Sequence, residues 1–99
     1  MGGPFQGQIR VMEITDGHKY FTEYDATDAY DEKSFGAVCT KIVIFNDSDH
    51  NCNISWDGTT LHGKLLPGES QTFTTEGADS IFVRVDDATG TNNIRIWAY

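Results

Sequence analysis

Residues 51–57 read NCNISWD, and the alternation within this stretch indicates the fold class of the whole chain. Cys52, Ile54 and Trp56 lie on one side of an extended backbone, whereas the residues between them are polar. Successive side chains of a β-strand point to opposite faces, so a period of two is typical of a strand with one buried face. The stretch therefore predicts a strand, and the Asp-Gly pair that follows predicts a tight turn.

Similar stretches lie on both sides of this strand. Residues 80–86 alternate in the same way, with Ile81, Val83 and Val85 predicted to face inward. The chain has 8 Ile, 5 Val and 11 Thr against 3 Leu, and residues branched at Cβ favour strands over helices. We therefore predict an all-β fold, a single small β-sandwich that is Ig-like or jelly-roll-like. Further strands are predicted at residues 8–14, 20–24, 37–46, 71–75 and 93–99.

The length of 99 residues allows one domain. Residues 1–7, MGGPFQG, hold three glycines and a proline, so we expect a flexible N-terminal arm without regular structure. Residues 8–99 form the predicted sandwich domain, with a loop insertion around residues 15–36. Within this insertion, residues 25–33 are acidic and carry Tyr30 as their one sizeable apolar side chain, which predicts an exposed loop.

The charge balance excludes two classes of partner. The chain carries 15 acidic and 7 basic side chains, which gives a formal charge of -8. A protein that binds nucleic acid or an anionic membrane has a surplus of Lys and Arg, so we expect neither partner. The chain has no run of about 18 apolar residues, and a membrane-spanning helix is therefore not expected.

The sequence holds no pattern typical of a catalytic or metal site. No serine lies in a G-x-S-x-G elbow, and no glycine-rich phosphate loop precedes a helix, so we predict that the protein is not an enzyme. The three histidines lack the paired spacings of zinc ligands, and neither a metal nor a cofactor is expected. Cys39 and Cys52 are predicted to be free buried thiols, with a disulfide or a metal site as the alternatives.

Trp56 allows three interpretations. Its place in the alternation, on the side of Cys52 and Ile54, favours a position in the core. A protein interface is the second interpretation. The third is a sugar site, because an exposed tryptophan beside Asp57 and Asn53 can stack on a pyranose ring while the polar side chains bind its hydroxyls.

Aromatic side chains are predicted on both faces of several strands. In the last strand, Trp97 and Tyr99 lie on the face opposite Ile96, although a sandwich of this size has one core to bury. A second covered surface is therefore expected, supplied either by the insertion around residues 15–36 or by another subunit. The residues predicted to contact partners are Phe5, Tyr20, Tyr24, Tyr30, Phe45, Phe82, Trp97 and Tyr99.

Residues 41–70, KIVIFNDSDHNCNISWDGTTLHGKLLPGES, resemble small β-sandwich proteins in the virions of tailed bacteriophages, of the decoration or head–tail type. The matching positions are a strand ending in Asn at residues 42–46, a strand with its Asp-Gly-Thr turn at residues 54–59, and a Leu-Pro-Gly turn at residues 66–70. The resemblance implies a non-enzymatic structural protein that binds capsid, connector or tail subunits and thereby decorates, stabilises or completes the particle.

The resemblance also implies a place in the virion, with assembly in the host cytoplasm, and a homo-oligomer is expected. The alternative function is that of a carbohydrate-binding module of a tail tip or fibre, which would recognise a receptor through Trp56.

Overall fold

The computed structural model describes residues 17–99. These residues form an all-β domain, as predicted. Six strands pair antiparallel in one sheet, in the order β1-β6-β2-β5-β3-β4. Phe5, the predicted arm at residues 1–7 and the predicted strand at residues 8–14 lie outside the described residues. The strands are β1 (Tyr20–Asp25), β2 (Asp31–Asn46), β3 (Cys52–Ser55), β4 (Gly63–Leu65), β5 (Ser70–Val85) and β6 (Asn93–Ala98).

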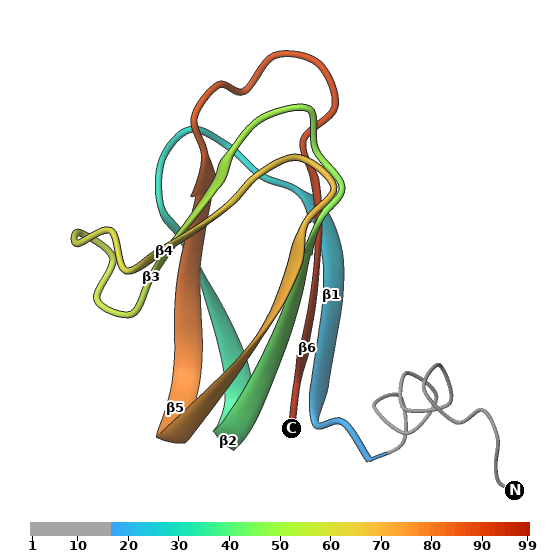
Figure 1. Ribbon diagram of the computed structural model, residues 1–99. Helices are drawn as coiled ribbons and strands as arrows, with labels where there is room; N and C mark the ends of the chain where they lie inside the picture. Colours follow the sequence, from blue (N-terminus) through green and yellow to red (C-terminus); the bar gives the residue numbers. More distant parts are fainter. Residues whose placement is uncertain (1–16) are drawn as a thin grey trace, which may run out of the picture.

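The two long strands, β2 and β5, bend together and fold the sheet back on itself (Figure 1). Near the start of β2, residues 31–34 pair with residues 80–83 of β5, and the register shifts before the two strands pair again further along β2. Gly77 of β5 lies at this bend with a φ of 156°, and a Cβ atom there would lie 3.0 Å from the Val38 side chain. Glycine is therefore favoured at this point, because it accepts the positive φ and leaves room for the neighbouring strand.

The bend divides the sheet into two layers whose inner faces share one core (Figure 1). The alternation predicted for residues 80–86 is confirmed, since Ile81, Val83 and Val85 have no exposed surface. The assignment as Ig-like or jelly-roll-like stays a prediction. The first layer holds β1, β6, residues 41–46 of β2 and residues 70–75 of β5, and the second layer holds residues 31–34 of β2, residues 80–85 of β5, β3 and β4.

The long strands extend beyond what the alternation predicts. β5 is continuous over Ser70–Val85, where the sequence pattern predicts two shorter strands. The loop predicted at residues 25–33 is also too long, because β2 begins at Asp31 and the connection from β1 covers residues 26–30. Glu32 pairs with Phe82 across the β2–β5 ladder. Local acidic composition indicates a loop, but a strand with one face in solvent accommodates the same side chains.

The edges of the two layers meet along two seams. At the first seam, β1 lies against the start of β2, and the rings of Tyr20 and Phe35 are 5.3 Å apart. At the second seam, Trp56 packs edge to face on Phe73 of β5, with the ring centres 5.7 Å apart. The two seams therefore differ in the elements that meet there, and the second seam holds one of the candidate sites described below. No helix among residues 17–99 has the length and apolar character needed to cross a bilayer.

Candidate functional site

Three aromatic rings lie in a row on the outer face of the first layer, and we name them the aromatic strip: Phe21 of β1, Trp97 of β6 and Phe45 of β2. The Trp97 ring centre lies 4.9 Å from that of Phe21 and 5.4 Å from that of Phe45. Phe21 is 44% exposed, whereas the other two rings are half-buried. Each ring is thus held by a neighbouring ring while part of its surface faces solvent.

The strip follows from the alternation of three paired strands. Ile96 is fully buried in the core, so the next side chain in β6, Trp97, points outward. The register then places Trp97 opposite Phe21 in β1 and opposite Val43 in β2, and Val43 is only 4% exposed. A sheet face that meets solvent normally carries polar side chains, so a row of aromatic residues there is a candidate interface.

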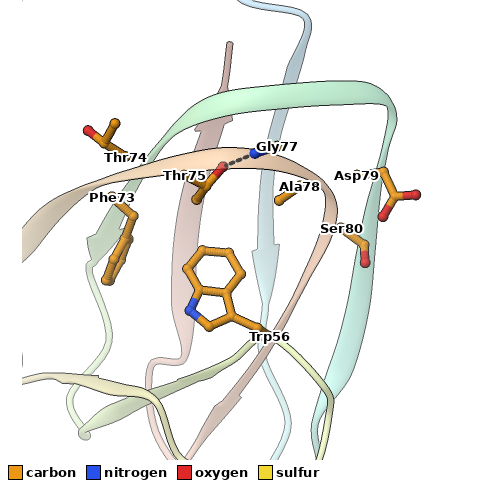
Figure 2. A pocket seen from close by; sticks show the side chains of 8 residues that line it. All are labelled: Trp56, Phe73, Thr74, Thr75, Gly77, Ala78, Asp79 and Ser80. Atoms are coloured by element: carbon orange, nitrogen blue, oxygen red, sulfur yellow. Dashed lines mark hydrogen bonds between the residues drawn. The ribbon is translucent and has the colours of Figure 1, made fainter.

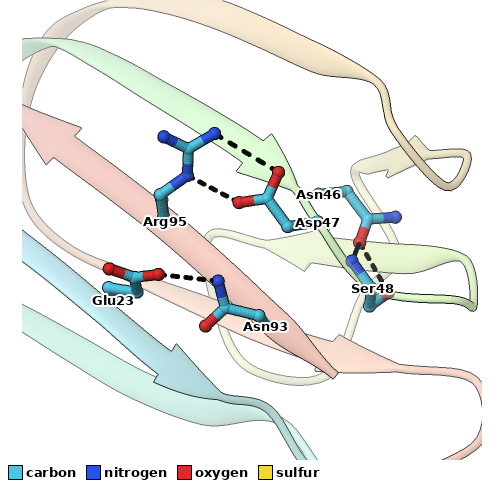
Figure 3. A network of polar contacts seen from close by, with 6 residues as sticks. All are labelled: Glu23, Asn46, Asp47, Ser48, Asn93 and Arg95. Atoms are coloured by element: carbon cyan, nitrogen blue, oxygen red, sulfur yellow. Dashed lines mark hydrogen bonds and ion pairs between the residues drawn. The ribbon is translucent and has the colours of Figure 1, made fainter. Parts of the chain in front are cut away.

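A polar network borders the strip (Figure 3). Arg95 binds Asp47 through two atom pairs, Nε–Oδ2 at 2.5 Å and Nη2–Oδ1 at 3.3 Å. This pairing holds the guanidinium carbon 4.7 Å from the centre of the Phe45 ring, in a cation–π contact. On β6, Asn93 donates a hydrogen bond to the Glu23 carboxylate at 2.9 Å. The strip therefore has one ordered cation at its edge, next to two carboxylates.

The end of β2, next to Phe45, is fixed by a buried amide. The Asn46 side chain accepts hydrogen bonds from the backbone amide and the hydroxyl of Ser48, at 3.0 and 2.6 Å (Figure 3). Its own NH2 group donates to the carbonyls of His50 and Leu65. Because all these partners are satisfied inside the fold, the turn after β2 has a defined shape and so does the position of Asp47.

The second seam opens into a groove of about 560 Å³ (Figure 2). Trp56 and Phe73 form its aromatic part, with their ring planes nearly perpendicular at 88°. Thr75 lies between them and the bend, where its hydroxyl donates to the Cys39 carbonyl and accepts from the Gly77 amide. The residues that line the groove are Trp56, Phe73, Thr74, Thr75, Gly77, Ala78, Asp79 and Ser80.

The core interpretation of Trp56 is confirmed in part, and the two binding interpretations stay predictions. Its ring packs against the buried core cluster, as the alternation predicts, but the residue is only half-buried and lines the groove. The polar residues suggested for a sugar site do not join it there. Asn53 is buried and donates to the Asp86 carboxylate at 2.6 Å, and Asp57 caps the turn after β3.

The structure brings two of the predicted contact residues, Phe45 and Trp97, together in the aromatic strip. Tyr20 and Tyr24 point inward at the first seam, where the Lys33 Nζ atom lies 3.8 Å from the centre of the Tyr24 ring. Burial raises the pKa of Tyr24 well above its usual range.

Phe21 is not among the contact residues predicted from the sequence, although it follows Tyr20 and alternation places the two on opposite faces. Which of these faces points outward depends on the pairing of β1 with β6, and in that pairing Phe21 lies opposite Trp97.

Phe82 and Tyr30 lie apart from the strip. Phe82 is on the outer face of the second layer, and a Cβ atom at Gly58 would lie 3.0 Å from its ring, so the turn after β3 covers it. Tyr30 contacts Arg84, whose guanidinium carbon lies 5.3 Å from the ring centre. Tyr99 has the Lys41 ammonium 5.7 Å from its ring centre. Each of these rings therefore contacts its own chain.

Groups with shifted pKa values lie at a turn and in the core. The backbone amides of Thr60 and Thr59 donate to the Asp57 carboxylate at 2.8 and 2.9 Å and hold its pKa well below the usual range. Cys39 and Cys52 are free and buried, as predicted, and burial raises the pKa of Cys52 to about 12. Within residues 17–99, no group of His, Cys, Asp and Glu side chains is arranged to hold a metal ion.

The described part of the chain thus offers two surfaces suited to binding, the aromatic strip on the first layer and the groove at the second seam. The strip is built from β1, β6 and β2, whereas the groove is built from β5 and from Trp56, which follows β3. Their chemistry also differs, since the strip is a row of rings and the groove mixes rings with hydroxyl groups. No family model, no curated protein and no solved structure matches this chain.

Proposed function

We propose that the chain is a non-enzymatic structural subunit of a tailed-phage virion, and that it docks on a capsid, connector or tail subunit through its aromatic strip. The observation that carries this proposal is the row formed by Phe21, Trp97 and Phe45, which keeps aromatic surface exposed on a sheet face that would otherwise be polar. The resemblance of residues 41–70 to small virion proteins supports the choice of particle.

The energetics of interfaces favour this use of the strip. Aromatic residues and Arg are enriched at the centres of protein interfaces and contribute much of the binding energy there. In the strip, Trp97 lies between two other rings, and Arg95 is fixed by Asp47 over Phe45. Side chains that are already ordered lose little conformational entropy when a partner binds, which increases affinity.

The charged side chains beside the strip indicate which kind of subunit can cover it. Glu23 and Asp25 lie on the outer face of β1 beside Phe21, and the whole chain has a formal charge of -8. Arg95 on this face is already paired with Asp47, so basic residues of a partner are favoured opposite Glu23 and Asp25. We therefore expect the subunit that covers the strip to carry an apolar patch with basic residues beside it.

The test is co-sedimentation of the purified chain with particles that lack it. Wild-type protein is expected to bind, and Phe21→Ser is expected to weaken binding by about 5- to 30-fold, the effect of losing one exposed ring of the strip. Leu61→Ser is the matched control, since Leu61 is 53% exposed and lies outside the strip. Circular dichroism checks that both variants fold.

Two results would count against the proposal. The first is wild-type protein that never sediments with particles, and the second is an equal loss of binding in the Leu61→Ser control. Sedimentation velocity of the chain alone, at several concentrations, tests the homo-oligomer that the resemblance predicts.

A further inference from the structure

We propose that the groove at the second seam is a binding site for a neutral saccharide, with one sugar ring stacked on Trp56. The site goes beyond the proposed docking function, because it uses none of the residues of the aromatic strip. It also differs from the sugar site that the sequence alone suggests, since its polar groups come from β5 rather than from Asn53 and Asp57.

The aromatic part of the groove is preorganised. Trp56 packs against the core on one side and faces the groove on the other (Figure 2). Phe73 stands nearly perpendicular to it, at 88°, so the two rings form adjoining sides of the groove. A pyranose has an apolar face of C–H groups that packs well on an aromatic ring, and a ring fixed by the core loses no entropy on binding.

The polar part of the groove suits hydroxyl groups. The indole N–H of Trp56 and the hydroxyl of Ser80 form no hydrogen bond with other residues of the range 17–99, whereas the side chains of Thr74 and Asp79 point away from Trp56 (Figure 2). The hydroxyl of Thr75, in contrast, is engaged by the backbone at the bend. The groove therefore presents donors and acceptors around an aromatic surface, the arrangement by which proteins orient small polar ligands.

Size and charge narrow the ligand class. A volume of about 560 Å³ lies within the range of sites that bind small molecules. Asp79 is the one ionisable side chain among the residues that line the groove, and it is acidic. This carboxylate points away from Trp56 (Figure 2), and no base lines the groove to pair with an anionic ligand, so a neutral sugar fits better than a sialylated or phosphorylated one.

The experiment is a titration of the 15N-labelled chain, followed by NMR, with three neutral disaccharides: cellobiose, lactose and N,N′-diacetylchitobiose. At least one is expected to shift the backbone signals of residues 73–80 and the indole signal of Trp56 saturably at millimolar concentration. The indole signal of Trp97 lies on the outer face of the first layer and serves as the internal reference.

Two matched variants test the role of the groove. Ser80→Ala is expected to weaken binding by about 2- to 10-fold, the effect of one lost hydrogen bond. Ser34→Ala is the control, because Ser34 lies opposite Ser80 in the β2–β5 ladder but does not line the groove. Trp56→Phe is expected to weaken binding further, since it removes the larger ring and the indole N–H.

Three outcomes would overturn the proposal. One is the absence of shifts with all three disaccharides. Another is an equal loss of affinity in Ser80→Ala and Ser34→Ala. The third is tighter binding of sialyllactose than of lactose, which contradicts the charge argument. None of these results depends on whether the chain binds phage particles, so the two proposals fail or succeed separately.

Discussion

The two seams join the same two layers but are filled differently. At the first seam, Phe35 is only 4% exposed and contacts Tyr20, while Lys33 covers the Tyr24 ring. At the second seam, Trp56 and Phe73 stay half-buried and border an open groove. A small folded sheet therefore need not close both of its edges, and an edge left open is a place where a ligand can bind.

The size of the inward side chains explains this difference. Both edges of the first seam bring large side chains inward, and these meet across the gap. The second seam places Gly77 and Ala78 at the bend of β5, and these small residues leave space beside the two aromatic rings. Apolar surface that no side chain covers remains available to a ligand.

The largest expected effect comes from removing one ring at each seam. Phe35→Ala is expected to lower the free energy of unfolding by about 3–5 kcal/mol, the usual cost of deleting a buried aromatic side chain. Trp56→Ala should cost about 2 kcal/mol, because its ring is half-buried and loses less apolar contact. Urea denaturation measures both values. If Trp56→Ala costs as much as Phe35→Ala, the second seam is as well packed as the first.

Filling the groove should make the second seam resemble the first. Ala78 lines the groove and packs against the core, so Ala78→Val is expected to raise the free energy of unfolding by about 1 kcal/mol through burial of its added carbons. The same variant should weaken the NMR shifts caused by disaccharides. A decrease in stability would mean that the site has no room for the larger side chain.

The Lys33 ammonium at the first seam should contribute less to the free energy of unfolding than these aromatic side chains. Lys33→Gln removes the contact with the Tyr24 ring and is expected to cost about 0.5–1 kcal/mol in unfolding free energy. Lys33 also binds Asp31 at 3.0 Å, but this carboxylate is half exposed to solvent and such pairs contribute little. Asp31→Asn is therefore the control and should leave the stability nearly unchanged. Equal losses in the two variants would assign the effect to the ion pair.

The smallest expected effect is a dependence of stability on pH, caused by Asp57 in the turn that follows Trp56. Because the pKa of Asp57 is lower in the folded chain than in the unfolded chain, the unfolded state takes up the proton first as the pH falls below about 4. Stability from this group is therefore present above that pH and is lost in acid.

The measurement is the melting temperature between pH 5 and pH 2 (about the range in which carboxylates titrate). Asp57→Asn keeps the oxygen that accepts from Thr59 and Thr60 but removes the charge, so its melting temperature should fall less steeply. Asp86 and Asp87 also have lowered pKa values, and a residual slope is expected from them. An unchanged slope in Asp57→Asn would contradict the assignment.

Local alternation was sufficient to predict the strands and their buried faces where partners lie on both sides. Ile81, Val83 and Val85 are buried as the period of two predicts, and so are Ile94 and Ile96. Alternation was insufficient for the start of β2 and for the continuity of β5, because both depend on pairing between residues about 30 to 50 positions apart in the chain.

The candidate sites, too, were predictable from the sequence only in part. The sequence placed Phe45 and Trp97 on outward faces, yet it could not show that Phe21 joins them, since the β1–β6 register decides which face of β1 points outward. It drew attention to Trp56, but the ring that meets Trp56 is Phe73, from a strand on the other side of two turns. No local pattern marks that pair.

Composition and a period of two are local properties, so the order of residues was enough to predict a small acidic all-β domain with more aromatic side chains than one core can bury. Where those side chains gather depends on how the strands pair. The strip needs three strands in register, and the groove needs a bend at Gly77 that brings Phe73 to Trp56. Both arise from long-range pairing, which the order of residues along the chain does not display.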